Sequence, residues 1–349
     1  MEAEMRAVVF ERPGEVLERE VPTPEPASGE VVVRVAACGV CGTDAHIFRG
    51  EYMADYPIVG GHELAGTIAS LGCGVTGWHE GDRVAVDPNI FCGDCYFCKS
   101  NRANHCQRFS AVGVTRDGGF AEYVAAPARN LYRVPDGLSL QDAALVEPVS
   151  CVVYALQRVR ALAGSSALVF GAGPMGQLLL QGLRRSGAAS VAVVDRVPTR
   201  LALARQLGAE SVVLAAGDEP PRDELRSLKP LGFDVVVDAT GLPKVVEGMF
   251  EFAKPTAKIL FFGVGPKGET VAISPYDVFQ NDWEIYGSFA PRYTFHPAID
   301  LISSGAIQVR PVVSHSIPLQ DLPTYLRGEL RLERAGKVLV TPQGATGDE

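Results

Sequence analysis

The chain has 349 residues, of which 47% are hydrophobic and 21% are charged, and these fractions exclude an intrinsically disordered chain, a collagen and a continuous coiled coil. A net charge of −9 without any Lys/Arg cluster argues against a nucleic-acid partner, and no stretch approaches the ~20 apolar residues of a membrane span. The length predicts about two domains. We expect a soluble, cytoplasmic protein, because the first residues lack the basic-then-apolar pattern of a signal peptide.

The first third of the chain contains short β-branched runs bounded by Gly, Pro and Asp, which predicts an all-β region with strands over 31–35, 66–69 and 82–86. From about residue 150 the pattern changes to alternating strands and helices, and it breaks again near Ser288. This alternation indicates a parallel sheet covered on both faces. The elements expected there are helices over 152–162, 175–185 and 199–207 and strands over 167–170, 191–195, 211–214, 233–239, 259–264 and 285–287.

Cys41 and the adjacent pair His62-Glu63 are candidate metal ligands. Thiolate and imidazole are ligands that zinc prefers, although a lone cysteine or histidine is more often a core residue. Glu147, just before the change of pattern, supplies a carboxylate where the two domains should meet. Its alternative interpretation is an acidic residue at a helix N-terminus, which is common.

Four cysteines occur within fifteen residues as Cys92-x-x-Cys95-x-x-Cys98-x7-Cys106. Four thiolates can surround one tetrahedral ion and leave no open position, which is typical of a structural zinc site. An iron–sulfur cluster is the alternative, but the bacterial cluster run has a shorter last gap and a following proline, whereas Gln107 follows Cys106. We therefore expect a structural zinc lobe over about 88–110.

Gly171-Ala172-Gly173-Pro174-Met175-Gly176 has the pattern G-x-G-x-x-G, follows a predicted strand and opens a predicted helix. In that context the glycines permit a tight turn, close approach of a pyrophosphate and helix–strand packing. Asp195 ends the next predicted strand, where a carboxylate can bind the adenosine ribose. A carboxylate there favours NAD over NADP, although Arg196 directly after it could accommodate a 2′-phosphate.

Taken together, the motifs resemble those of the zinc-dependent medium-chain dehydrogenases of the alcohol, polyol and sugar type. The resemblance implies an α/β two-domain fold, with a GroES-like, β-rich catalytic domain made of 1–151 and 288–349 and a Rossmann NAD-binding domain inserted over 152–287. It also implies a homodimer or homotetramer. The matching segments are Cys-Gly-Val-Cys-Gly-Thr-Asp (38–44), Gly-His-Glu (61–63), Gly-Asp-Arg-Val-Ala (81–85), the four cysteines, Gly-Gly-Phe-Ala-Glu-Tyr (118–123), Glu-Pro-Val-Ser (147–150) and the glycine loop.

The resemblance implies a catalytic zinc besides the structural one, and therefore two zinc ions per chain. Cys41 and His62 match its ligands, and Asp44 would orient His62. Glu63 and Glu147 compete for the third position, and the Glu-Pro-x-Ser form is similar to the sorbitol and threonine dehydrogenase branch. We expect Glu147 near the metal in every state and Glu63 as a ligand only when water or substrate leaves, because neighbouring residues on a strand point to opposite faces.

Other residues match family positions for proton transfer and cofactor binding. Thr43 and His46 match a relay that takes the alcohol proton to solvent. Arg292-Tyr293 resembles an Arg-Tyr pair near the substrate of polyol enzymes, and Ile47 departs from the tyrosine that sorbitol dehydrogenases often carry there. The expected cofactor contacts are the glycine loop, Asp195, Arg200, Gly263, Val264 and Arg292.

We therefore expect reversible oxidation of a secondary alcohol in a polyol, sugar or cyclitol, with hydride transfer to NAD and with NADP less favoured. One alternative is a non-catalytic nucleotide-binding relative, which would be expected to have lost Cys41 or His62. Another is a primary-alcohol or aldehyde enzyme of the same family, which favours cysteine at the position of Glu147.

Overall fold

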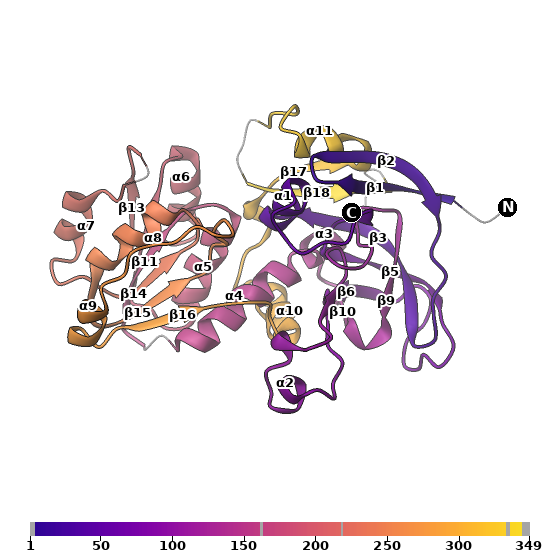
Figure 1. Cartoon of the computed structure of the whole chain (residues 1–349), viewed down its shortest axis with the longest axis horizontal. Coiled ribbons are helices and arrows are strands. Elements are labelled where there is room, and N and C mark those ends of the chain that lie inside the picture. Colours follow the sequence, from indigo (N-terminus) through magenta and orange to yellow (C-terminus); the bar gives the residue numbers. More distant parts are fainter. Residues whose placement is uncertain (1–3, 161–162, 218, 333–335, 344–349) are drawn as a thin grey trace.

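Figure 1 shows the computed structural model, which describes residues 4–160, 163–217, 219–332 and 336–343. One part of the molecule is rich in strands and contains segments from both ends of the chain, whereas the other is built around a parallel sheet. The predicted α/β two-domain class is confirmed. Within the described residues, no helix is both long and apolar enough to cross a membrane.

The largest sheet of the β-rich part has the strand order β10-β6-β5-β3-β18-β17, with β9 also paired to β3. The runs predicted over 31–35 and 66–69 lie inside β3 and β5, and the run over 82–86 corresponds to β6. Val338 pairs with Val40, so a C-terminal strand completes a sheet begun near the N-terminus. Its strands are β3 (Glu30–Val40), β5 (Glu63–Leu71), β6 (Arg83–Val86), β9 (Tyr123–Pro127), β10 (Leu131–Arg133), β17 (Val313–Pro318) and β18 (Lys337–Thr341).

Two smaller sheets complete this part of the molecule. The first has the order β2-β1-β4 and covers the barrel-like sheet, and the second, β7 with β8, forms the base of the four-cysteine lobe. The lobe projects below the rest of the molecule in Figure 1. The elements are β1 (Glu4–Arg12), β2 (Glu15–Pro22), β4 (Ile58–Val59), β7 (Asn89–Ile90), β8 (Ser110–Ala111), α1 (Gly42–Arg49), α2 (Tyr96–Lys99), α3 (Leu140–Ala143), α11 (Leu322–Leu326) and the 3-10 turns η1 (Ala103–His105), η2 (Ala128–Asn130), η4 (Arg310–Val312) and η5 (Leu319–Asp321).

The second part contains a six-stranded parallel sheet in the order β13-β12-β11-β14-β15-β16. The order reverses between β11 and β14, which is the doubly wound arrangement whose ligands bind outside the carboxyl ends of the strands at that point. All five residues of β11 are buried, as expected for a central strand covered on both faces. The strands are β11 (Ser166–Phe170), β12 (Ser190–Asp195), β13 (Ser211–Leu214), β14 (Phe233–Asp238), β15 (Ala253–Phe261) and β16 (Glu284–Gly287).

Each predicted strand of this sheet is present, with shifted ends. β15 stops at Phe261 and not at Val264, because the N–H groups of Phe262 and Gly263 turn toward the carbonyl oxygen of Asp238. The predicted helices over 175–185 and 199–207 are confirmed within a residue. The helices of this part are α5 (Pro174–Arg185), α6 (Pro198–Gln206), α7 (Arg222–Leu228), α8 (Pro243–Met249), α9 (Pro275–Gln280) and the 3-10 turn η3 (Phe250–Phe252).

The helix α4 (Val146–Val159) joins the two parts and packs against α10 (Phe295–Ser303). It begins six residues before the predicted start at 152, and 161–162 lie outside the described residues. Val146, Val149 and Val152 are buried in a core that also includes residues of β3 and β11. Since α4 runs across the predicted domain boundary at 151/152, the boundary itself stays a prediction, and Glu147 sits in the first turn of a helix that belongs to both parts.

Candidate active site and metal sites

The four-cysteine lobe brings its sulfur atoms together as the spacing predicts. The ligand atoms of all four cysteines lie within 4.8 Å of one another, with 3.8 Å between the Sγ atoms of Cys92 and Cys98 and 4.0 Å between those of Cys95 and Cys106. Two thiolates on one tetrahedral zinc, each at about 2.3 Å, are about 3.8 Å apart. The donor set and its spacing therefore fit a structural zinc ion.

Backbone N–H groups prepare these thiols for ligation. The N–H groups of Cys92 and Arg108 donate to the Sγ atom of Cys106, each at 3.3 Å. Hydrogen bonds from the backbone at Gln107 and Cys98 lower the pKa of Cys95 to about 6. A thiolate is the form that binds a metal, so these hydrogen bonds favour the metal-binding form of Cys95.

A second group of ligand atoms combines Cys41, His62 and Glu63, which also lie within 4.8 Å of one another. Cys41 precedes α1, His62 precedes β5, and Glu63 is the first residue of β5. The chain turns at Gly61, whose φ of +92° is a left-handed conformation that glycine adopts without strain. His62 lies just before the strand and Glu63 begins it, and their ligand atoms lie close together although the residues are adjacent.

Glu63 is held by a lysine that the sequence analysis did not single out. The Nζ atom of Lys337 lies 2.7 Å from both carboxylate oxygens of Glu63 and donates to the carbonyl oxygen of Val40 at 3.1 Å. The two side chains are only 4% and 1% exposed. Burial disfavours the charged form of Lys337, but the charge of Glu63 outweighs it and raises the lysine pKa.

Glu147 lies outside the group formed by Cys41, His62 and Glu63, and which of the two carboxylates serves the metal stays a prediction. It is buried on α4, and its Oε1 atom accepts a hydrogen bond from the Cys151 thiol at 3.2 Å. Burial raises the pKa values of both Glu147 and Cys151. The side chain of Cys151, one helical turn after Glu147, is a neighbour that the spacing could have suggested.

Asp44 lies behind His62, as expected for a group that orients a metal-binding imidazole. Its Oδ1 atom is 3.6 Å from the Nδ1 atom of His62, and its Oδ2 atom accepts the N–H of Cys41 at 2.7 Å. Burial opposes protonation of His62, but Asp44 and then Cys41 outweigh it and raise the pKa of the imidazole. One fully buried carboxylate thus faces two of the three candidate ligands.

The two relay candidates lie on α1, beside the metal group. The Oγ1 atom of Thr43 is 3.7 Å from the Sγ atom of Cys41. One turn later, the Nδ1 atom of His46 lies 2.8 Å from a carboxylate oxygen of Glu51, whose pKa is lowered by that imidazole. The His46 side chain is 17% exposed, so it reaches solvent from the inside of the site.

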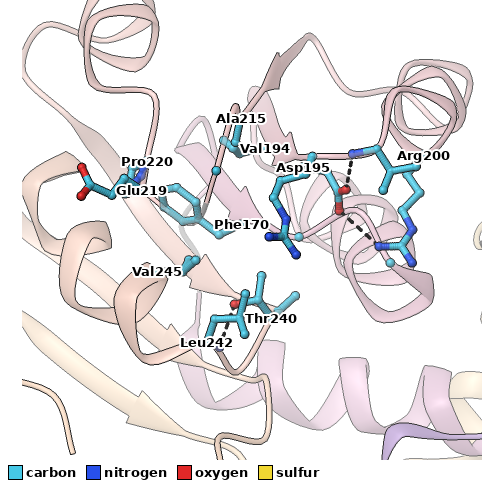
Figure 2. Close-up of a pocket in the computed structure, with 16 residues that line it drawn as sticks. Phe170, Val194, Asp195, Arg200, Ala215, Glu219, Pro220, Thr240, Leu242 and Val245 are labelled. Carbon is cyan, nitrogen blue, oxygen red and sulfur yellow. Dashed lines mark hydrogen bonds and ion pairs between the residues drawn. The ribbon is translucent and has the colours of Figure 1, made fainter.

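The glycine loop borders a pocket at the carboxyl edge of the parallel sheet. Figure 2 shows Asp195 and Arg200 on one side of this pocket, opposite Phe170 and Val245. The Asp195 carboxylate accepts the backbone N–H groups of Ala172 at 2.7 Å and Val197 at 2.8 Å, and it lies 3.8 Å from Arg200. The predicted ribose-binding carboxylate is therefore fastened directly to the glycine loop.

The remaining cofactor candidates have different positions. A Cβ atom at Gly176 would lie 1.8 Å from the carbonyl oxygen of Gly171, so the third glycine is needed for close packing. Gly263 lies against Gly241 beyond the ends of β15 and β14, and Val264 is 57% exposed beside it. Arg292 does not line the pocket of Figure 2, and its contact with the cofactor stays a prediction.

Asp87 is a buried carboxylate near the site that no sequence motif marked. Its Oδ1 atom accepts both the backbone N–H of Asn89 at 2.9 Å and the side-chain amide of Asn89 at 3.0 Å. Burial raises the pKa of Asp87 to about 7, and the charge of Glu147 adds to that effect. The β-rich part therefore contains a buried acid, Asp87, whose protonation changes near pH 7.

Comparison with known proteins agrees with this geometry. Residues 27–136 match the alcohol dehydrogenase GroES-like domain, and residues 174–304 match the zinc-binding dehydrogenase model. D-arabinitol dehydrogenase 1 of Uromyces fabae is 35% identical over 97% of this chain and 98% of its own length. This chain belongs to the zinc-binding dehydrogenases.

Other members of the family are similar along the same length. D-altritol 5-dehydrogenase of Agrobacterium fabrum is 33% identical to this zinc-binding dehydrogenase over 91% of this chain and 94% of its own. A crystal structure of a zinc-binding dehydrogenase from Sinorhizobium meliloti, bound to NADP, has a TM-score of 0.92 at 34% identity and covers 98% of this chain and 100% of that one. The protein is an oxidoreductase of this family.

Proposed function

We propose that this zinc-binding dehydrogenase oxidises a secondary alcohol of a polyol or sugar to a ketone, with NAD as hydride acceptor, and also catalyses the reverse reaction. The observation that carries the proposal is the Cys41–His62–Glu63 group in the same chain as a dinucleotide pocket that contains Asp195. The similarity to D-arabinitol and D-altritol dehydrogenases along nearly the whole chain supports a polyol as substrate.

Two metal sites are part of the proposal. The four cysteines of the lobe would hold a structural zinc, and Cys41 and His62 would hold a second zinc together with Glu63 or Glu147. When bound, the second zinc supplies a Lewis acid that lowers the pKa of a coordinated hydroxyl, and the nicotinamide accepts a hydride. The chemistry of both donor sets fits zinc, since thiolate, imidazole and carboxylate are its usual ligands.

The chain's own residues provide a path for the alcohol proton. Thr43 stands beside Cys41 and would accept the proton at its hydroxyl, and His46 would pass it to solvent next to Glu51. An imidazole suits this transfer because its ordinary pKa of about 6.5 is close to neutral pH. Lys337 meanwhile holds Glu63 in place through both carboxylate oxygens.

NAD is the proposed cofactor, and the Asp195 carboxylate is the reason. A carboxylate can accept hydrogen bonds from the ribose hydroxyls of NAD and repels the 2′-phosphate of NADP. Arg196 also lines this pocket, and the similar structure from Sinorhizobium meliloti contains NADP. Asp195→Ala should therefore weaken the binding of NAD and narrow or reverse the preference for NAD over NADP, measured as kcat/KM with both cofactors. A wild type with higher kcat/KM for NADP would contradict this part of the proposal.

The direct test is a screen of pentitols, hexitols, sugars and simple primary alcohols with NAD and NADP, followed by absorbance of the reduced nicotinamide. We expect the highest kcat/KM with a polyol and NAD. A preference for primary alcohols would instead indicate the other branch of the family. No turnover in a protein that contains two zinc ions per chain would contradict the proposed activity.

A further inference from the structure

The four-cysteine lobe makes polar contact with a segment almost two hundred residues away in sequence, 287–294. The Nδ2 atom of Asn104, in the lobe, donates to the carbonyl oxygen of Phe289 at 2.8 Å and to the hydroxyl oxygen of Tyr154 on α4 at 3.2 Å. Asn104 is 3% exposed. A second contact joins the Nη1 atom of Arg292 to the Oδ1 atom of Asn101 at 2.5 Å.

Aromatic rings fill the same contact. The imidazole of His105 stacks on Phe289 with 5.9 Å between centroids, and Phe109 lies 6.1 Å from the same ring. Phe91, next to the first cysteine, meets Tyr293 edge-on at 6.3 Å. The contact is therefore made by three separate stretches of the lobe, each within three residues of one of the four cysteines.

The backbone at this contact adopts unusual conformations. Asn101 in the lobe and Ala290 and Tyr293 in the segment have φ values of 56°, 44° and 57°. Non-glycine residues rarely adopt the left-handed region, and such conformations persist where the surroundings determine them. The segment 287–294 is thus held in its shape by contacts, with the lobe on one side and α4 on the other, where the Nε atom of Arg158 donates to the carbonyl oxygen of Gly287 at 2.8 Å.

The position of the segment in the sheet shows what it could do. It begins at Gly287, the carboxyl end of β16, and in a doubly wound sheet ligands bind outside the carboxyl ends. The pocket with Asp195 lies at the ends of β11 and β12, on one side of the switch point between β11 and β14. A dinucleotide whose adenosine occupies that pocket would place its other half toward β14, β15 and β16, where the segment lies.

We infer that the four-cysteine lobe positions segment 287–294 for the nicotinamide half of the cofactor. Asn104 is the positioning residue, because its amide holds the segment against the lobe. The inference rests on the proposed use of a nicotinamide dinucleotide. A lobe that only stabilised the fold would need no buried amide directed at the carbonyl of Phe289. The amide group of Asn104 connects the lobe to both the segment and α4, because its Nδ2 atom donates to Phe289 and to Tyr154.

The test compares NADH and ADP-ribose, which lacks the nicotinamide, as ligands of the zinc-loaded full chain. Asn104→Leu keeps the volume but removes the donor, and Asn101→Gly keeps the left-handed backbone of an exposed residue while removing the contact to Arg292. Gln181→Leu is the matched control, since Gln181 is also a buried amide that bonds a distant backbone, at Gln308. Hydrogen exchange of amides 287–294 and the zinc content are measured on the same samples.

We expect Asn104→Leu to raise the Kd for NADH about tenfold, the effect of one buried hydrogen bond, and to leave the Kd for ADP-ribose unchanged. Exchange in 287–294 should accelerate while both zinc ions stay bound. Asn101→Gly should change NADH binding in the same direction by a smaller factor, which keeps the test valid if Asn104→Leu folds poorly, and Gln181→Leu should affect neither ligand.

Three results would overturn the inference: unchanged NADH binding in both lobe variants, an equal loss of ADP-ribose binding, or the same change in Gln181→Leu. A wild type that binds NADH but oxidises no polyol would contradict the proposed substrate, while the effects of Asn104→Leu would still support this inference. A wild type that binds no NADH would overturn both.

Discussion

The two groups of metal ligands are built in opposite ways. The four cysteines of the lobe come from fifteen consecutive residues, three of them are partly exposed, and backbone N–H groups prepare their sulfur atoms. The group of Cys41, His62 and Glu63 combines two separate segments with Lys337 from the other end of the chain, and its charged groups are nearly all buried. The first site is local and self-contained, whereas the second exists only after the sheet has closed.

The difference indicates that the lobe contributes mainly to stability and that the buried site is the one suited to catalysis. A structural metal that organises a short exposed segment adds its binding free energy to folding. A buried site with charges from distant segments depends on a completed fold, and each charge needs a partner because burial without one is costly. Three variants test whether the two sites differ in this way.

The largest effect is expected from His62→Ala. Loss of a ligand at the buried site should lower kcat/KM at least about 10³-fold, because direct charge stabilisation of the developing alkoxide is lost. The zinc content should fall from two ions to one per chain. Cys95→Ser is the counterpart, since it should lower zinc content and stability together. Elemental analysis that finds iron with inorganic sulfide in the wild type would refute the assignment of the lobe.

A smaller effect is expected from Lys337→Met, which leaves the Glu63 carboxylate buried without its partner. Removing one member of a buried ion pair costs about 3–5 kcal/mol, and we expect this loss in urea unfolding of the metal-free protein. The loss should shrink in the zinc-loaded protein, where the ion can compensate Glu63. Arg116→Met is the control, since its pair with Glu30 is partly exposed and should contribute at most about 1 kcal/mol. Equal losses in the two variants would mean that the Lys337 pair has no special role.

The third variant, Asp87→Asn, uses pH. The folded-state pKa of Asp87 is raised to about 7 by burial, so between pH 4 and 7 the folded protein retains a proton that the unfolded chain has released. Stability therefore falls as pH rises through this window, by about 3–4 kcal/mol at about 1.4 kcal/mol per unit. The free energy of unfolding of Asp87→Asn, measured in urea, should therefore rise by that amount relative to the wild type between pH 4 and pH 7.

Asp94 in the lobe is the control, because its pKa is shifted in the opposite direction to that of Asp87. Arg108 lowers the pKa of this exposed carboxyl to about 2, so its contribution is present above the ordinary pKa of aspartate and is lost only as pH falls toward 2. Asp94→Asn should therefore show a constant difference from the wild type between pH 5 and 7. A parallel pH dependence of the two variants would exclude the buried acid as the source of the slope.

Much of the architecture follows from local patterns in the sequence. The strands of the parallel sheet are continuous apolar runs such as Ser166–Phe170, and the glycine loop follows such a run directly. The cysteine spacing in the lobe indicates a tetrahedral site by itself, because four thiolates separated by short loops can surround one ion. These features could be predicted because short-range chain geometry determines them.

The position of the Glu63 carboxylate beside Cys41 and His62 follows from the tertiary structure. Strand alternation by itself directs Glu63 away from His62, yet their ligand atoms lie within 4.8 Å of each other, and no spacing rule connects Glu63 with Lys337 across 274 residues. The ends of helices were also less certain, since α4 begins at Val146 through packing on α10 and on both sheets.

What the sequence determined alone is therefore the list of chemical groups and their local order: four thiolates in one lobe, a dinucleotide loop with Asp195, and a cysteine and a histidine able to bind zinc. Tertiary folding, in contrast, brings the buried charges together, namely Glu63 with Lys337 and Asp44 with His62 and Cys41. The physical reason is that these pairs depend on strand pairing between distant segments, such as β3 with β18, and no local backbone preference encodes that pairing.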